Sequence, residues 1–308
     1  MIGITGGSGY IGSHLAREFI KRDEKVRIID IAPPPRDLVD KYFYADINDE
    51  SGIFRGIEGC DTVYHLAAVV SKLRGFEDRR YCIQTNILGT LNVLEACVKL
   101  DVERLIYMGT SEVLGEPLYN PTDENHPRRP KTTYGITKCA SEDLCYEYHV
   151  TYGLSAVLPR LYMVYGTNDI RPIRYHNVIV KFIWNTLHDK PPIAYKGCIR
   201  SFLFITDCVE ALTLLKDKGK AGEIYDICAD PKEAISTEDL AKLVIRLCGK
   251  NFEPIIQEPP STDTKVKLPS GKKARSELGW SPKISLNEGL KRVVEEWKKY
   301  AAEGLPAK

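Results

Sequence analysis

The segment Thr5–Gly12, TGGSGYIG, decides the fold that this sequence predicts. An apolar run, MIGIT, precedes it and an amphipathic run, SHLAREFIKR, follows it. Gly6, Gly9 and Gly12 have GxxGxxG spacing, and glycine at these points permits a sharp turn and a close backbone approach to a pyrophosphate. The N–H groups at the start of the following helix attract the same anion. We predict a strand–turn–helix unit that binds a dinucleotide, against the alternative of a purely structural turn.

An acidic residue at the end of the next predicted strand extends this unit. Asp30 closes the run VRIID, 24 residues after Gly6. A carboxylate there accepts hydrogen bonds from the adenosine ribose hydroxyls and repels a 2′-phosphate. The sequence therefore favours NAD over NADP.

The rest of the first half alternates short apolar runs with longer helical ones. Strands that are apolar on both faces are typical of a parallel sheet covered by helices. We therefore predict an α/β fold, a Rossmann-type doubly wound parallel sheet over residues 1–165, followed by a smaller α/β substrate-binding region over residues 166–308. Further predicted strands are 41–46, 61–68, 104–111, 155–161, 192–196 and 222–228, and predicted helices are 81–100, 134–153, 178–189, 206–217, 236–249 and 286–303.

Composition limits the partners of the protein. The formal net charge of the 308 residues is +1, which gives no electrostatic basis for binding nucleic acid or an anionic membrane. No apolar run approaches the ~20 residues of a membrane span. Nine cysteines without a CxxC pair indicate free thiols in the cytoplasm and no metal site.

A tyrosine and a lysine lie four residues apart in YGITK, on one face of a predicted helix. A Tyr side chain has a pKa of ~10 and is a poor base at neutral pH. We expect the ammonium of Lys138, together with the positive charge of the nicotinamide, to lower the pKa of Tyr134, so that the phenolate takes a proton from a sugar hydroxyl. YxxxK is also common by chance on helix surfaces.

Together with the glycine turn, YGITK and the segments VYHLAA, TNILGTLNVLEAC and RSFLFITD stand in a recognisable order. The sequence resembles the extended short-chain dehydrogenase/reductase family, the NAD-dependent nucleotide-sugar epimerases, dehydratases and decarboxylases. The resemblance implies tightly held, recycled NAD, a nucleotide-diphosphate sugar substrate oxidised transiently at C4, and a homodimer formed through helices that contain residues 92–100 and 134–150.

The resemblance also implies roles for individual residues. Thr110 is the hydroxyl partner of Tyr134, Lys138 also bridges the nicotinamide ribose, and Arg200 binds the diphosphate. The implied cofactor-binding residues are Gly6, Gly9, Tyr10, Ile11, Gly12, Asp30, Asp46, Ile47, Leu66, Ala67, Ala68, Asn86, Tyr134 and Lys138. The implied substrate-binding residues are Ser111, Asn177, Arg200 and Asp263.

The residues after Thr110 bear on the reaction. The dTDP-glucose 4,6-dehydratases carry Asp and Glu at these two positions, whereas this sequence has Ser111 and Glu112. The Thr-Ser-Glu triple resembles UDP-glucuronate decarboxylases and GDP-mannose 4,6-dehydratases, and simple 4-epimerases usually have a small residue in place of Glu112. The segment HNVI, with Asn177, looks instead like an epimerase.

Two departures affect substrate binding. Met163 replaces a common asparagine, and Pro260 stands where an epimerase arginine would bind the second phosphate; Arg171 or Arg174 is a candidate replacement for that charge. We expect an NDP-hexose 4-epimerase of the UDP-glucose/galactose type. The alternative is UDP-glucuronate decarboxylation or NDP-sugar 4,6-dehydration with Glu112 as the catalytic carboxylate, and a remote one is a non-catalytic NAD-binding regulator.

Overall fold

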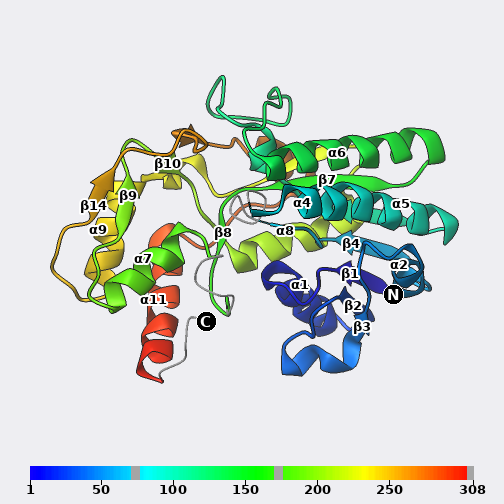
Figure 1. Ribbon diagram of the computed structural model, residues 1–308, viewed down its shortest axis with the longest axis horizontal. Coiled ribbons are helices and arrows are strands. Elements are labelled where there is room, and N and C mark those ends of the chain that lie inside the picture. The colour runs from blue at the N-terminus through cyan, green and yellow to red at the C-terminus, as the bar shows by residue number, and fades with distance from the viewer. Residues whose placement is uncertain (71–76, 170–175, 304–308) are drawn as a thin grey trace.

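The computed structural model describes residues 1–70, 77–169 and 176–303. Its central feature is a parallel sheet in the spatial order β12-β7-β5-β4-β1-β2-β3, with the short β6 also paired to β7 (Figure 1). The strands of this sheet are β1 (Ile2–Thr5), β2 (Val26–Asp30), β3 (Tyr42–Tyr44), β4 (Thr62–His65), β5 (Arg104–Tyr107), β6 (Gly109–Thr110), β7 (Ala156–Leu161) and β12 (Ile224–Ile227). The predicted Rossmann-type doubly wound sheet is confirmed.

Helices cover both faces of the sheet. One face packs against α1 (Tyr10–Lys21) and α8 (Ile205–Lys218), and the other packs against α2 (Glu50–Ile57), α5 (Gly89–Lys99) and α6 (Thr133–Tyr152). Successive strand residues point to opposite faces, so Val63 of β4 joins one buried cluster and Tyr64 joins the other. Both faces are therefore hydrophobic core, as the apolar strands predict.

The predicted helix over 81–100 is divided in the structure. It comprises α4 (Arg79–Ile83), a π-helical turn at Gln84–Leu88 and α5. Such turns widen a helix locally and are frequent beside functional sites. Here the turn carries Thr85 into the wall of the main cavity.

A second group of elements lies beside the carboxyl ends of the strands, on the left of Figure 1. Its helices are α7 (Val178–Leu187), α9 (Thr237–Leu247) and α11 (Leu286–Ala302), whereas α10 (Lys272–Leu278) packs against α8 and β12 of the main sheet. Its strands are β8 (Val164–Tyr165), β9 (Ile193–Tyr195), β10 (Ile199–Arg200), β11 (Leu203–Phe204), β13 (Ile235–Ser236), β14 (Ile255–Gln257) and β15 (Val266–Lys267). Short 3₁₀ helices lie at Arg36–Lys41, Ser111–Val113 and Pro231–Glu233.

The strand at 222–228 is placed differently from the sequence prediction. We expected it among the elements of the C-terminal region, but β12 extends the main sheet beside β7. The reason is its burial on both faces, since Tyr225, Asp226 and Ile227 are all fully buried. A division of the chain at residue 165 stays a prediction, and the sheet takes one strand from beyond it.

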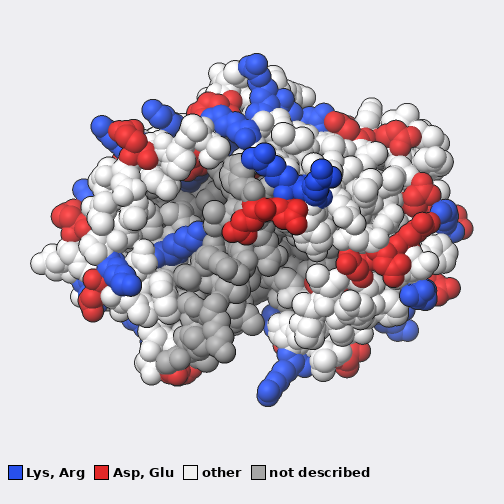
Figure 2. Space-filling view, viewed as in Figure 1, with Lys and Arg blue, Asp and Glu red and all other residues white. Residues whose placement is uncertain are grey.

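The surface charges and the cysteines complete the description of the fold. Positive and negative side chains are interspersed over the face drawn in Figure 2. All nine cysteines are free, and the cytoplasmic location inferred from them stays a prediction. Within the part of the chain that the structure describes, no helix has the length and apolar character of a membrane span.

Candidate active site

The glycine turn between β1 and α1 is packed too tightly for side chains. Gly6 has φ +68°, and a Cβ there would lie 2.6 Å from the backbone nitrogen of Ala67. A Cβ on Gly12 would lie 2.5 Å from the carbonyl oxygen of Gly6. The turn thus leaves its backbone bare at the mouth of a cavity, as an approaching pyrophosphate requires.

Asp30 ends β2 directly beside this turn. Its carboxylate accepts hydrogen bonds from the backbone N–H groups of Ser8 at 3.0 Å and Ala32 at 3.1 Å. Burial raises the pKa of Asp30, while these two N–H donors act to lower it. An acceptor is therefore fixed where the second strand ends, beside the glycine turn, and its contact with a ribose stays a prediction.

A cavity of about 740 Å³ runs from the glycine turn along the carboxyl ends of the strands. It continues past Thr85 and reaches Thr110 and Met163. Among the predicted cofactor residues, its wall contains Gly6, Gly9, Tyr10, Ile11, Gly12, Asp30, Asp46, Ile47, Leu66, Ala67, Ala68, Tyr134 and Lys138. The bare glycine turn, the fixed carboxylate and the length of the cavity fit an extended dinucleotide.

Asn86 is the predicted cofactor residue that lies behind this wall. Its amide oxygen accepts from the Val69 N–H at 2.7 Å, and its amide nitrogen donates to the Thr137 hydroxyl at 2.9 Å. Asn86 is 1% exposed. In the structure it ties the loop after β4 to α6.

The tyrosine and lysine lie in the first turns of α6, which Thr132 caps by accepting from the Gly135 N–H at 3.1 Å. Tyr134 lines the cavity, and Thr110 lines the same cavity. The Lys138 ammonium lies 4.2 Å from the ring centre of Tyr107. The structure thus brings Thr110, Tyr134 and Lys138 to one end of the cavity.

The chain without its cofactor does not lower the pKa of Tyr134, so the expected effect of Lys138 and the nicotinamide on this phenol stays a prediction. Burial raises the pKa of Tyr134, and the hydrogen bond with Thr110 lowers it only in part. Burial also lowers the pKa of Lys138 to about 8. Desolvation is therefore the main cause of both shifts.

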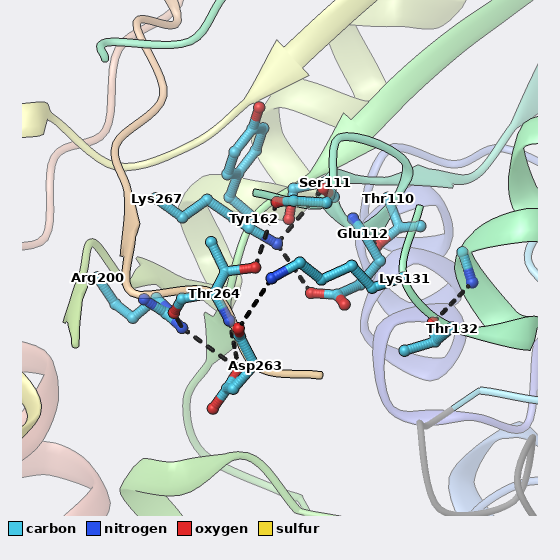
Figure 3. Close-up of polar contacts among 12 residues, drawn as sticks. Thr110, Ser111, Glu112, Lys131, Thr132, Tyr162, Arg200, Asp263, Thr264 and Lys267 are labelled. Atoms are coloured by element: carbon cyan, nitrogen blue, oxygen red, sulfur yellow. Dashed lines mark hydrogen bonds and ion pairs between the residues drawn. The ribbon is translucent and has the colours of Figure 1, made fainter. Parts of the chain in front are cut away.

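Glu112 has a partner that the sequence analysis missed. Thr110 accepts a hydrogen bond from the Glu112 N–H at 3.3 Å and so begins the 3₁₀ turn at Ser111–Val113. Lys267 Nζ lies 2.9 Å from Glu112 Oε1 and donates to the buried Ser111 carbonyl oxygen at 3.4 Å (Figure 3). No sequence pattern signals this pair, because Lys267 lies in a turn-rich connector far along the chain.

The side chains of Arg200 and Asp263, two of the predicted substrate residues, lie in contact. Arg200 Nη2 lies 3.4 Å from Asp263 Oδ1, and Nη1 donates to the carbonyl oxygens of Ile199 at 2.9 Å and Lys265 at 2.8 Å. Nη2 also donates to the Thr264 carbonyl oxygen (Figure 3). In this structure the guanidinium holds the segment before β15 against β10, and its diphosphate contact stays a prediction.

The other predicted substrate residue, Asn177, caps α7. Its side-chain oxygen accepts from the Val180 N–H at 3.3 Å, and its amide donates to the Val164 carbonyl oxygen at 3.0 Å. Arg171 and Arg174, the candidate replacements for the missing phosphate-binding arginine, lie outside the described residues.

Comparison with known proteins agrees with this geometry. Residues 2–228 match the model of the NAD dependent epimerase/dehydratase family. The chain belongs to this family. A putative UDP-glucose 4-epimerase of Methanocaldococcus jannaschii is 32% identical, with 97% of this chain and 98% of that protein covered.

Other similar proteins of the epimerase/dehydratase family are named after different reactions. Human dTDP-D-glucose 4,6-dehydratase is 31% identical, with 95% of this chain and 88% of that protein covered. The solved UDP-glucose 4-epimerase of Thermotoga maritima, determined with UDP-glucose, superimposes with a TM-score of 0.90 at 28% identity, over 97% of this chain and 99% of that one. These similarities establish the family and leave the choice of reaction to the residues of the site.

Proposed function

We propose that this member of the family is a 4-epimerase of nucleotide-diphosphate hexoses, of the UDP-glucose/UDP-galactose type. The observation that carries the proposal is the placement of Tyr134 and Thr110 together at one end of the dinucleotide-sized cavity. The similarity to the archaeal protein named as a putative UDP-glucose 4-epimerase supports it. Bound NAD would supply a reversible hydride acceptor at C4 of the sugar.

Side chains of the protein would transfer the proton of the C4 hydroxyl and orient the C4 oxygen. In the proposed reaction Tyr134 acts as the phenolate, a form that the positive charges of Lys138 and of bound nicotinamide would favour. The phenolate takes the proton of the C4 hydroxyl and later returns it, and Thr110 orients that oxygen by hydrogen bonding. Lys138 places a cation beside them, on the helix face that Tyr134 occupies. Epimerisation needs no other acid or base, because only the face from which C4 regains its hydrogen changes.

Glu112 favours a second candidate, chemistry at C5 and C6 after C4 oxidation. Its carboxylate lies two residues after Thr110, and its negative charge acts on Tyr134. A carboxylate there can abstract the C5 proton in a 4,6-dehydratase, or assist a C6 decarboxylation. These two reactions are the alternatives to epimerisation.

One labelling experiment separates the candidates. The protein is incubated in deuterated water with UDP-glucose, UDP-galactose, UDP-glucuronate, dTDP-glucose and GDP-mannose, and the products are followed by NMR. We expect inversion at C4 with the C5 hydrogen retained; deuterium at C5 or loss of CO2 contradicts the 4-epimerase. Tyr134→Phe is the matched control, because it removes one oxygen and should abolish turnover while bound NAD is retained. An inactive wild type that still binds NAD would instead indicate a regulator.

We also propose a homodimer formed through α5, α6 and the π-helical turn between α4 and α5. Large apolar side chains are exposed there, with Leu88 53%, Ile136 54% and Val150 65% exposed. Cys97 of α5 and Tyr148 of α6 are buried within one chain. The exposed apolar side chains, and not these buried ones, support the proposed interface.

A further inference from the structure

A series of buried hydrogen bonds runs from the strand before the glycine turn to the helix that carries Tyr134. His65, the last residue of β4, lies in the middle of this series and is 1% exposed. Its Nδ1 lies 2.6 Å from the hydroxyl oxygen of Thr5, and its Nε2 lies 3.0 Å from that of Thr90. Both ring nitrogens therefore have a side-chain partner, one on β1 and one on α5.

The threonine on α5 determines which ring nitrogen of His65 carries the proton. A threonine hydroxyl has one proton, and that of Thr90 is donated to the Asn86 carbonyl oxygen at 2.6 Å. Towards His65 the Thr90 oxygen is then only an acceptor, so the ring proton is on Nε2. Burial, with a smaller effect of the Lys138 charge, lowers the pKa of His65 to about 3, so the neutral ring has no second proton. Nδ1 is consequently the acceptor for the hydroxyl of Thr5.

The Thr5 end of the series reaches the wall of the main cavity. While the Thr5 hydroxyl donates to His65, its oxygen accepts from the Ala67 N–H at 3.3 Å. Thr5 directly precedes Gly6, and both Gly6 and Ala67 line the cavity. His65 thus helps to fix the backbone that faces the dinucleotide-sized space.

The Asn86 end of the series reaches α6. The Asn86 carbonyl oxygen, which accepts from Thr90, also accepts from the Ser141 hydroxyl of α6 at 2.6 Å. The Asn86 amide donates to the Thr137 hydroxyl at 2.9 Å, and that hydroxyl donates to the Tyr134 carbonyl oxygen at 2.8 Å. From β1 to α6, each donor therefore points along the series towards the helix that carries Tyr134.

A buried network whose members are all hydrogen-bonded is rigid, because a displaced group cannot find water as a substitute partner. This network joins the strand before the glycine turn, the loop after β4, the π-helical turn and α6. Each of these parts borders or lines the main cavity. The cofactor wall and the residues proposed for proton transfer are thus connected through the protein interior as well as through a bound ligand.

We propose that His65, in its Nε2–H tautomer, is a positioning residue that holds the cofactor wall and Tyr134 in one arrangement. His65 lies behind the wall and acts through its bonds with Thr5 and Thr90. The effect on Tyr134 rests on the proposed function, whereas the tautomer and the effect on NAD binding do not depend on which sugar is converted.

The tautomer is tested by nitrogen NMR of protein labelled with ¹⁵N-histidine. The signals of His65 are identified by their absence in His65→Gln, and spectra are recorded from pH 5 to pH 8. We expect a single Nε2–H tautomer that stays neutral throughout this range. An Nδ1–H tautomer, or a ring that gains a second proton in this range, overturns the inference.

Two variants of nearly equal shape separate positioning from a merely structural role. Thr90→Val removes the acceptor of the His65 Nε2–H. Thr213→Val is the matched control, because Thr213 is also a buried helical threonine and donates to the Glu210 carbonyl oxygen of its own helix at 2.8 Å.

The dissociation constant of NAD is measured by titration calorimetry, and kcat and KM are measured with the sugar nucleotide that the protein converts. We expect Thr90→Val to weaken NAD binding and to lower kcat by about tenfold each, the size of one buried hydrogen bond, with KM nearly unchanged. Thr90→Ser, which keeps the hydroxyl, should restore both quantities. Thr213→Val should leave both at the wild-type level.

The outcomes for the network and for the reaction are distinct. Wild-type NAD affinity and kcat in folded Thr90→Val overturn the inference even if C4 is epimerised. If both fall as expected but deuterium enters C5, the network is supported while the proposed 4-epimerase is contradicted. If the wild type converts no sugar, the NAD dissociation constants and the tautomer decide the inference. Thr5→Val breaks the other bond of His65 and takes the place of Thr90→Val if that variant does not fold.

Discussion

Lys138 is a buried cation, and its environment makes the stability of the protein depend on pH. Burial lowers its pKa to about 8, whereas an unfolded lysine titrates near ~10.4. Between these values the unfolded chain binds more protons than the native one, so the free energy of unfolding rises with pH. Tyr134 adds little in this window, because burial raises its pKa and its phenol stays neutral.

We predict that the difference in unfolding free energy between wild type and Lys138→Met increases from pH 8 to pH 10 in nucleotide-free protein. The slope is on the order of 1.4 kcal/mol per pH unit at most. Urea unfolding followed by circular dichroism at several pH values measures it. A difference that stays constant or falls across this range would show that Lys138 is not desolvated as described.

At the scale of elements, the turn between β1 and α1 decides both packing and cofactor binding. We predict that Gly6→Ala loses NAD binding and about 1–3 kcal/mol of stability, because its Cβ would lie 2.6 Å from the backbone of Ala67 at a φ of +68°. Gly153→Ala is the control, since Gly153 has φ +73° at the end of α6 with nothing within 4 Å.

The control should lose only about 1 kcal/mol and keep its affinity for NAD. Titration calorimetry with NAD and urea unfolding give the two quantities for each variant. Wild-type affinity in Gly6→Ala would mean that the turn does not contact the cofactor.

Local sequence patterns predict the helices and strands of the fold, whereas the contacts within the site depend on residues that are far apart in the sequence. Apolar strand runs and the glycine turn predict β1, α1 and β2 because their signals lie within a few residues. The membership of β12 in the main sheet depends on its pairing with β7, which no local pattern encodes.

Individual site residues divide in the same way. The motif that contains Tyr134 and Lys138 spans five residues and can be recognised in the sequence. The partner of Glu112 is Lys267 of β15, which only tertiary folding brings close. The raised pKa of Tyr134 was also beyond the sequence, because it depends on how completely the folded chain excludes water.

At the scale of the whole molecule, the exposed apolar side chains along α6 and the preceding π-helical turn predict association. We predict that the protein is a dimer by light scattering and that Leu88→Lys combined with Val150→Lys converts it to a monomer. Buried cations in a dimer interface would lack partners and so disfavour assembly. Val39→Lys, at a valine that is 58% exposed outside these helices, should leave the dimer intact. A monomeric wild type would contradict the proposed interface.

The position of β12 also has a consequence for the order in which the chain can fold during synthesis. β7 emerges from the ribosome well before its neighbour, because β12 begins only at Ile224 and the segment between them builds the second group of elements. Until then β7 is an open sheet edge, which is a site for wrong pairing with another nascent chain. Completion of the nucleotide-binding sheet therefore waits for about three quarters of the protein to be translated, and a fragment that ends at residue 165 should aggregate rather than fold.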